Sequence, residues 1–208
     1  MSDDARRIID LYDRNAAAWD AARQSGRPPA EADWLERFLE MAPPGGRLLD
    51  LGCGSGVPIA RDLIASGRAV TGVDASPRLI ALCRARFSEA EWIVADMREL
   101  ALGERFSGIL AWHSLFHLTP DDQTRIFRIF AAHAAPGAAL LFTSGTRHAE
   151  TIGCWQGEPL YHASLAPAAY EALLAESGFS VVAHVEEDPD CGGATVWLAK
   201  AAGKTGHL

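Results

Sequence analysis

Residues 47–56, Arg-Leu-Leu-Asp-Leu-Gly-Cys-Gly-Ser-Gly, decide the fold of this 208-residue chain. The apolar run Leu48–Leu51 contains one acid and is typical of a buried strand. The three glycines at alternate positions that follow predict a loop that lets a ligand approach the main chain closely. Residues 57–66 predict a helix with Pro58 in its first turn. A strand, a glycine loop and a helix start together indicate a nucleotide site, because free N–H groups gather at the positive end of a helix.

The kind of nucleotide is narrowed by acids near the glycines. The spacing G-x-G-x-G differs from the G-x-G-x-x-G of dinucleotide sites. Asp50 would repel a pyrophosphate there and suits a ligand with an ammonium or sulfonium group. Two further apolar runs, residues 69–73 and 92–95, are followed by Asp74 and Asp96. We expect the three acids along the carboxyl edge of one parallel sheet, where α/β folds bind ligands, with Asp74 spaced to bind ribose hydroxyls.

The pattern of elements predicts an α/β fold with a mostly parallel sheet and helices on both faces. Strands are expected near residues 47–51, 69–73, 92–95, 108–112 and 138–143, with helices near 57–66, 76–87 and 120–134. A helix near 167–177 precedes two runs, 179–185 and 194–200, whose short connection predicts an antiparallel hairpin. We expect a single domain over residues 1–208, divided into a helical cap (1–42), a core (45–200) and a tail (201–208).

Composition excludes several classes of partner. The net charge of −8 argues against a nucleic-acid surface and an anionic membrane surface. No apolar stretch is long enough for a membrane helix, and the first residues lack the apolar core of a secretory signal. The four cysteines have no spacing typical of zinc or redox chemistry, so no metal is expected. A cytoplasmic protein is the expectation, and the oligomeric state stays open.

Three motifs resemble those of class I S-adenosylmethionine-dependent methyltransferases: Leu-Leu-Asp-Leu-Gly-Cys-Gly-Ser-Gly at 48–56, Val-Thr-Gly-Val-Asp-Ala-Ser at 70–76, and Val-Ala-Asp-Met at 94–97. The resemblance covers roughly residues 45–200. It implies a Rossmann-like, seven-stranded sheet with an antiparallel last strand, and S-adenosylmethionine as cofactor. It also implies cofactor contacts, with Gly52 and Gly54 at the methionine part, Asp50 near its ammonium, Asp74 and the neighbouring Ala75 at the ribose, and Asp96 with Met97 at the adenine.

The substrate side of the pocket is expected at the ends of the fourth and fifth strands. In related methyltransferases the turn after the fourth strand borders the transferred methyl group, so His113 or His117 is a candidate general base. The alternative for His117 is a structural role beneath the turn. Trp112 is expected as a wall against the cofactor and Phe116 as a substrate contact. The segment 144–165 predicts a long loop that carries two further substrate contacts, Tyr161 and His162, although buried anchors are an equal alternative.

The N-terminal helices are expected to close the site. Tyr12, Trp19 and Arg23 resemble residues that small-molecule methyltransferases place over the methionine carboxylate and sulfonium. An arginine binds a carboxylate bidentately, and an aromatic face stabilises a cation. The alternative is an amphipathic helix whose aromatic side chains pack on the core.

These observations predict a methyltransferase that transfers a methyl group to a small molecule by direct in-line displacement. Two alternatives stay open, a non-catalytic S-adenosylmethionine-binding module and a methyltransferase that acts on a protein. The acceptor, and whether its O, N, S or C atom is methylated, is not identified by the sequence.

Overall fold

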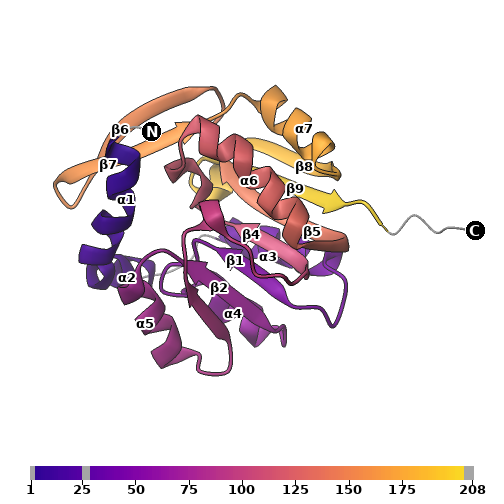
Figure 1. The fold of residues 1–208 in the computed structure, drawn as a ribbon, viewed down its shortest axis with the longest axis horizontal. Helices are drawn as coiled ribbons and strands as arrows, with labels where there is room; N and C mark the ends of the chain where they lie inside the picture. Colours follow the sequence, from indigo (N-terminus) through magenta and orange to yellow (C-terminus); the bar gives the residue numbers. More distant parts are fainter. Residues whose placement is uncertain (1–2, 25–28, 204–208) are drawn as a thin grey trace, which may run out of the picture.

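The computed structural model describes residues 3–24 and 29–203 (Figure 1). The α-helices are α1 (Asp3–Arg14), α2 (Ala16–Gln24), α3 (Pro29–Met41), α4 (Ile59–Ala65), α5 (Pro77–Arg86), α6 (Pro120–His133) and α7 (Pro167–Glu176). The strands are β1 (Leu48–Leu51), β2 (Val70–Asp74), β3 (Glu91–Val94), β4 (Phe106–Ala111), β5 (Ala134–Ser144), β6 (Ala149–Trp155), β7 (Glu158–Ser164), β8 (Phe179–Asp188) and β9 (Ala194–Ala201). Three short 3-10 turns, η1 (Met97–Glu99), η2 (Leu115–His117) and η3 (Pro189–Cys191), complete the elements described.

Seven strands form one sheet in the order β3-β2-β1-β4-β5-β9-β8. The pairs from β3 to β5 are parallel, and β9 lies antiparallel between β5 and β8. This arrangement confirms the predicted Rossmann-like sheet with its antiparallel last strand. It brings the carboxyl ends of β1, β2, β3 and β4 to one edge of the sheet.

Helices cover both faces of the sheet, which explains why β1 and β4 are buried along their whole length. On one face, α6 and α7 pack through side chains such as Phe127, Phe130 and Leu174. On the other face, α3, α4 and α5 contribute Phe38, Leu63 and other apolar residues. In Figure 1, α1 and α2 stand at the left of the molecule, with α5 below them and with α6 and α7 to their right.

Local caps fix where the helices begin at this edge. Ser76 accepts a hydrogen bond from the main-chain N–H of Leu79 at the start of α5, and Thr119 accepts one from Asp122 at the start of α6. Each cap is followed by a proline in the first turn, which suits that position because its missing N–H would have no helical partner. The caps therefore fix the start of α5 just after the end of β2, and the start of α6 just after η2.

The prediction of a long loop at residues 144–165 was wrong, because most of this segment forms a hairpin of β6 and β7. Gln156 and Gly157 connect the two strands with positive φ angles of 53° and 78°, the conformation that matches the twist of a tight hairpin. The hairpin extends over α1 in Figure 1. Ala5, Ile8 and Leu11 of α1 pack there against Tyr161 and Ala163 of β7.

Two further predictions concern the C-terminal tail and the membrane-spanning helices. The predicted tail lies mostly outside the described residues, since β9 runs to Ala201 and residues 204–208 are not described. Among the helices that are described, none combines the length and the apolar character needed to cross a lipid bilayer.

Candidate functional site

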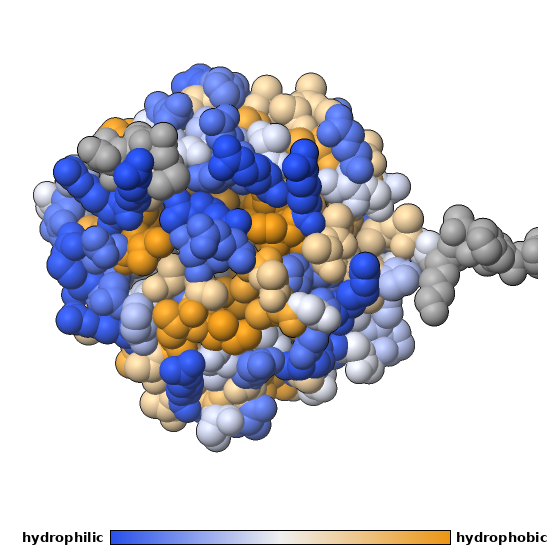
Figure 2. All heavy atoms as spheres, in the orientation of Figure 1, coloured by the Kyte–Doolittle hydropathy of each residue, from blue (hydrophilic) through white to orange (hydrophobic). Residues whose placement is uncertain are grey.

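The ends of β1, β2, β3 and β4 form the floor of a pocket, and α1 and α2 form its cover. The pocket has an empty volume of about 780 Å³. Ten of the predicted site residues line it: Tyr12, Trp19, Gly52, Gly54, Asp74, Ala75, Asp96, Met97, His113 and His117. Figure 2 shows apolar surface near the middle of this face of the molecule, bordered by hydrophilic residues.

The glycine loop is packed closely against neighbouring side chains. Gly52 and Gly54 have φ angles of +74° and +57°, which disfavour a side chain. A Cβ added at Gly52 would lie 2.3 Å from Cβ of Ser114, whose hydroxyl donates to the main-chain oxygen of Leu51. A Cβ added at Gly54 would lie 3.0 Å from Nε1 of Trp19. Both positions therefore need glycine for the loop to pack against the pocket walls.

Asp74 connects the glycine loop to the start of α5. Its carboxylate accepts hydrogen bonds of 2.9 Å from the N–H groups of Gly54 and Ser76. Burial raises the pKa of Asp74, although these two N–H groups act in the opposite direction. An acid held in this way at a pocket wall has acceptor capacity left for the hydroxyls of a ligand.

Asp50 lies within β1, opposite Gly72 of β2 and Leu110 of β4, and so one residue before the strand end. It does not line the pocket directly, and it is 2% exposed. Its Oδ2 is buried and has no hydrogen-bond partner among the residues described. Burial, together with the charge of Asp74, raises the pKa of Asp50 to about 7. A buried carboxylate with a free oxygen favours a cationic or hydrogen-bond-donating ligand beside it.

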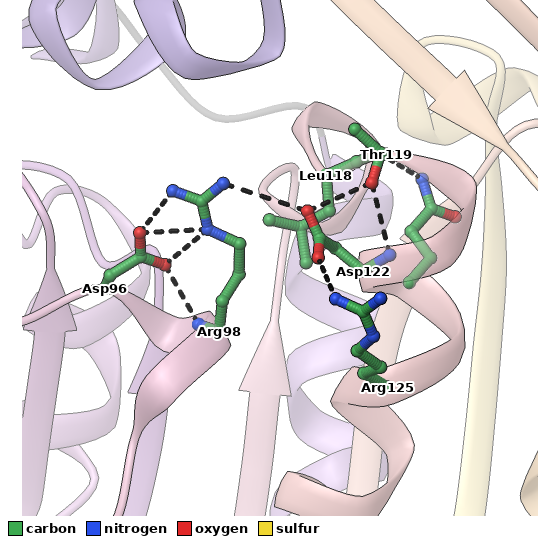
Figure 3. A network of polar contacts seen from close by, with 7 residues as sticks. Asp96, Arg98, Leu118, Thr119, Asp122 and Arg125 are labelled. Atoms are coloured by element: carbon green, nitrogen blue, oxygen red, sulfur yellow. Dashed lines mark hydrogen bonds and ion pairs between the residues drawn. The ribbon is translucent and has the colours of Figure 1, made fainter. Parts of the chain in front are cut away.

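Asp96 forms an ion pair with Arg98, a residue that was not among the predicted site residues. Arg98 donates to both of its carboxylate oxygens and approaches Asp122 at 3.8 Å (Figure 3). Burial alone would raise the pKa of Asp96, but the hydrogen bonds from Arg98 lower it. Asp122 also accepts from Arg125 and from the hydroxyl of Thr119. The network therefore connects the end of β3 to the start of α6.

The two candidate bases occupy different environments. His117 is held on both ring nitrogens, by the Tyr12 hydroxyl at Nε2 and the main-chain oxygen of Tyr161 at Nδ1, each 2.9 Å away. His113 has a φ of 51°, and its main-chain N–H donates to the hydroxyl of Thr143. Its Nε2 lies 3.4 Å from Oε1 of Glu31 on α3. A free lone pair is thus expected on His113 and not on His117.

Three of the predicted cofactor residues form the cover or lie behind it. Trp19 packs edge-on against Tyr12, with ring centroids 5.0 Å apart. Arg23 lies 5.8 Å from the centre of the Trp19 ring and 3.5 Å from Glu31, so its guanidinium faces an acid of this chain and not the pocket. Trp112 is buried and donates its Nε1 hydrogen to the same Glu31 oxygen.

The predicted substrate residues Phe116 and His162 line a second, more open hollow. It lies between the β6–β7 hairpin and the end of β5, and it also includes Arg147, Thr151 and Ser164. The His162 ring is 5.0 Å from that of His117 and 5.2 Å from that of Phe116, so the two hollows share a wall. Tyr161 contributes its main-chain oxygen to His117, while its own hydroxyl donates to Glu150.

Several pocket residues were missed by the sequence analysis. They are Ala5, Ile8, Ile9, Val73, Ser76, Leu79, Ala95, Arg98, Ser114 and Leu118. Most are apolar residues that look like ordinary core in the sequence, whereas Arg98 follows Asp96 by only two residues and could have been predicted as its partner. In residues 3–24 and 29–203, no three His, Cys, Asp or Glu side chains are grouped as metal ligands.

Comparison with known proteins identifies a family model that matches most of the chain and relatives that match just over half of it. The model of a family described as "Methyltransferase domain" matches residues 23–184. A dTDP-3-amino-3,6-dideoxy-alpha-D-glucopyranose N,N-dimethyltransferase of Streptomyces fradiae is 32% identical over 112 residues, covering 53% of this chain and 44% of the relative. A ubiquinone biosynthesis O-methyltransferase of Aromatoleum aromaticum is 36% identical over 127 residues, covering 58% and 52%. The chain thus spans about half the length of these relatives.

Solved structures share the fold. An amino pentose methyltransferase from Micromonospora echinaspora, determined with S-adenosylmethionine bound, superposes with a TM-score of 0.70 at 20% identity, covering 89% of this chain and 97% of that one. An S-adenosylmethionine-dependent methyltransferase from Clostridium acetobutylicum gives a TM-score of 0.72 at 15% identity, covering 93% and 100%.

Proposed function

The chain belongs to the methyltransferase domain family, and we propose that it uses S-adenosylmethionine to methylate a small-molecule acceptor by direct in-line displacement. The observation that carries the proposal is the pocket at the ends of β1 to β4, with the acids Asp50, Asp74 and Asp96 on or beside it. The relatives act on an amino sugar nucleotide and in ubiquinone biosynthesis, which supports a small-molecule acceptor.

The side chains at the pocket fit this cofactor. Asp74, at the end of β2, would hold the ribose hydroxyls. Asp50, whose unpartnered oxygen is buried beside the pocket, would lie near the methionine ammonium and interact with it through water. Asp96, held by Arg98, and Met97 would border the adenine. When bound, S-adenosylmethionine supplies a methyl group on a positively charged sulfur, ready for attack by a nucleophile.

The residues of the chain contribute position and exclusion of water. Tyr12 and Trp19 from the cover would lie over the reacting atoms, and their aromatic rings favour a cation at that place. The acceptor would enter from the hollow that carries Phe116 and His162 and would meet the pocket beside His113. Holding two reactants in line accounts for much of the rate of such a reaction.

Calorimetry of the full chain with S-adenosylmethionine, S-adenosylhomocysteine and NAD tests the cofactor. We expect binding of the first two and none of NAD, and Asp74→Asn should weaken binding more than Asp62→Asn, an acid on α4 outside the pocket. Tight NAD binding without S-adenosylmethionine binding would reject the proposal.

The acceptor class is tested with methyl-labelled S-adenosylmethionine. The label should reach a compound in a panel of amino sugar nucleotides and hydroxylated aromatic compounds, or in a pool of cell metabolites. Label found only on protein would indicate the protein-methylating alternative. Binding without any label transfer would indicate a non-catalytic module.

A further inference from the structure

Glu31 is a buried acid that neither the pocket lining nor the sequence motifs include. It lies in the first turn of α3 and is 3% exposed. Three donors surround its Oε1 atom: Nε1 of Trp112 at 3.0 Å, Nε2 of His113 at 3.4 Å and a guanidinium nitrogen of Arg23 at 3.5 Å. Two of these donors come from the turn after β4, which borders the pocket through His113.

The surroundings of Glu31 keep it ionised. Burial alone would raise its pKa, but the contacts with His113, Trp112 and Arg23 lower the pKa to about 2. Its position at the N-terminal end of a helix also favours a negative charge. Oε2 is buried without a hydrogen-bond partner in the described part of the chain. The carboxylate therefore has unused capacity to stabilise a positive charge on a neighbour.

The ring of His113 is oriented by its backbone and by this acid. The main chain at His113 is held in the left-handed region by the bond from its N–H to Thr143. An ionised carboxylate only accepts, so the ring nitrogen that faces Glu31, Nε2, carries the proton. The lone pair of the neutral ring is then on Nδ1, and Nδ1 has no hydrogen-bond partner among the described residues.

We propose that Glu31 is a positioning residue that holds His113 in the tautomer whose Nδ1 takes the proton of the methyl acceptor. The inference rests on the proposed function. A lone pair of the acceptor forms the bond to the methyl carbon while the carbon–sulfur bond breaks and its electron pair stays on sulfur. The acceptor's proton passes to Nδ1, and the resulting imidazolium is stabilised by Glu31 until it releases the proton to water. A negatively charged partner that orients a catalytic histidine serves the same purpose in other enzymes.

The tautomer is measured without any acceptor or cofactor, by nitrogen NMR of the full chain with labelled histidine at pH 8.5. His113→Asn identifies the signals of the ring. We expect a protonated Nε2 and a free Nδ1 in the wild type. Glu31→Gln, which keeps an acceptor oxygen, should retain part of this preference, and Glu31→Ala should lose it. A wild-type ring protonated on Nδ1, or a tautomer unchanged in Glu31→Ala, would overturn the proposal.

A double-mutant cycle tests whether Glu31 acts through His113, using the acceptor that the labelling assay identifies. We expect His113→Asn to lower kcat on the order of 100-fold and Glu31→Gln about 10-fold, with little change in KM for S-adenosylmethionine. The double variant should be no slower than His113→Asn alone, because the acid has nothing left to orient. Additive losses would show that Glu31 acts independently and would refute the proposal.

Glu36→Gln is the matched control, since Glu36 lies on the same helix and is exposed; its kcat should equal that of the wild type. Calorimetry with S-adenosylmethionine distinguishes a failure of the proposed function from a failure of the role of Glu31. If the wild type fails to bind it, the proposed function is wrong. If every variant binds it normally and kcat of Glu31→Gln is unchanged, the role of Glu31 is wrong and the function stands.

Discussion

The hydroxyl of Tyr12 lies 2.9 Å from Nε2 of His117 and joins α1 to the turn after β4. The partner of Nδ1 is the main-chain oxygen of Tyr161, which only accepts, so Nδ1 carries the proton and Nε2 accepts from the phenol. Burial lowers the pKa of His117 to about 4, and burial raises the pKa of Tyr12. Both groups are therefore neutral near pH 7. The lone pair of His117 is already used, which favours His113 of the two candidate bases.

The lowered pKa of His117 makes stability depend on pH. Between its folded value of about 4 and an unfolded value near 6.5, the unfolded chain binds more protons, so stability falls as pH decreases through this range. The contribution is at most about 3 kcal/mol. Urea unfolding at pH 7 and pH 4.5 should show a smaller loss in His117→Gln than in the wild type. The exposed His148→Gln variant is the control and should behave as the wild type; equal losses in all three proteins would contradict the assignment.

Gly52 is predicted to be far less replaceable than a glycine with the same backbone conformation elsewhere. Gly103 has a φ of +71° and nothing within 4 Å of an added Cβ, whereas at Gly52 the Cβ would lie 2.3 Å from Ser114. Gly103→Ala should cost about 1 kcal/mol of stability from backbone strain alone. Gly52→Ala should cost roughly 1–3 kcal/mol more and abolish S-adenosylmethionine binding. Denaturation and calorimetry check both, and similar effects at the two sites would exclude the steric explanation.

Arg98 should matter for the site while Arg125, on the other side of Asp122, should not. Arg98 is largely buried and donates to both oxygens of Asp96, whereas the Arg125 side chain is 70% exposed (Figure 3). Arg98→Met leaves a half-buried carboxylate unpaired, which costs about 1–3 kcal/mol and should weaken S-adenosylmethionine binding. Arg125→Met should change stability by less than about 1 kcal/mol. If the two variants bind S-adenosylmethionine equally well, Arg98 has no part in the site.

The fold was predictable because its signals are local. The run Leu48–Leu51, the glycines after it and the acids after the next two strands each depend on a few neighbouring residues. The parallel order of the strands then brings the glycines and both acids to one edge of the sheet. The hairpin of β6 and β7 was missed because its turn, Gln156-Gly157, is a weak hairpin signal and β6 is almost entirely exposed. Glu31 was missed because it contacts Trp112 and His113 about 80 positions away, a relationship with no sequence pattern.

Asp50 should make cofactor binding release a proton. Burial and the charge of Asp74 raise its pKa to about 7, so at pH 6 the free protein holds a proton there. A bound ammonium group favours the ionised form and should displace close to one proton per site at pH 6 and almost none at pH 8.5. Calorimetry at pH 6 in phosphate and in imidazole buffer measures this release as a difference in heat. Asp50→Asn should abolish the difference, and adenosine, which lacks the methionine part, should bind without it. Equal heats for S-adenosylmethionine in both buffers would show that Asp50 does not sense the ammonium, because a carboxylic acid that ionises when a cation binds beside it must release its proton to the buffer.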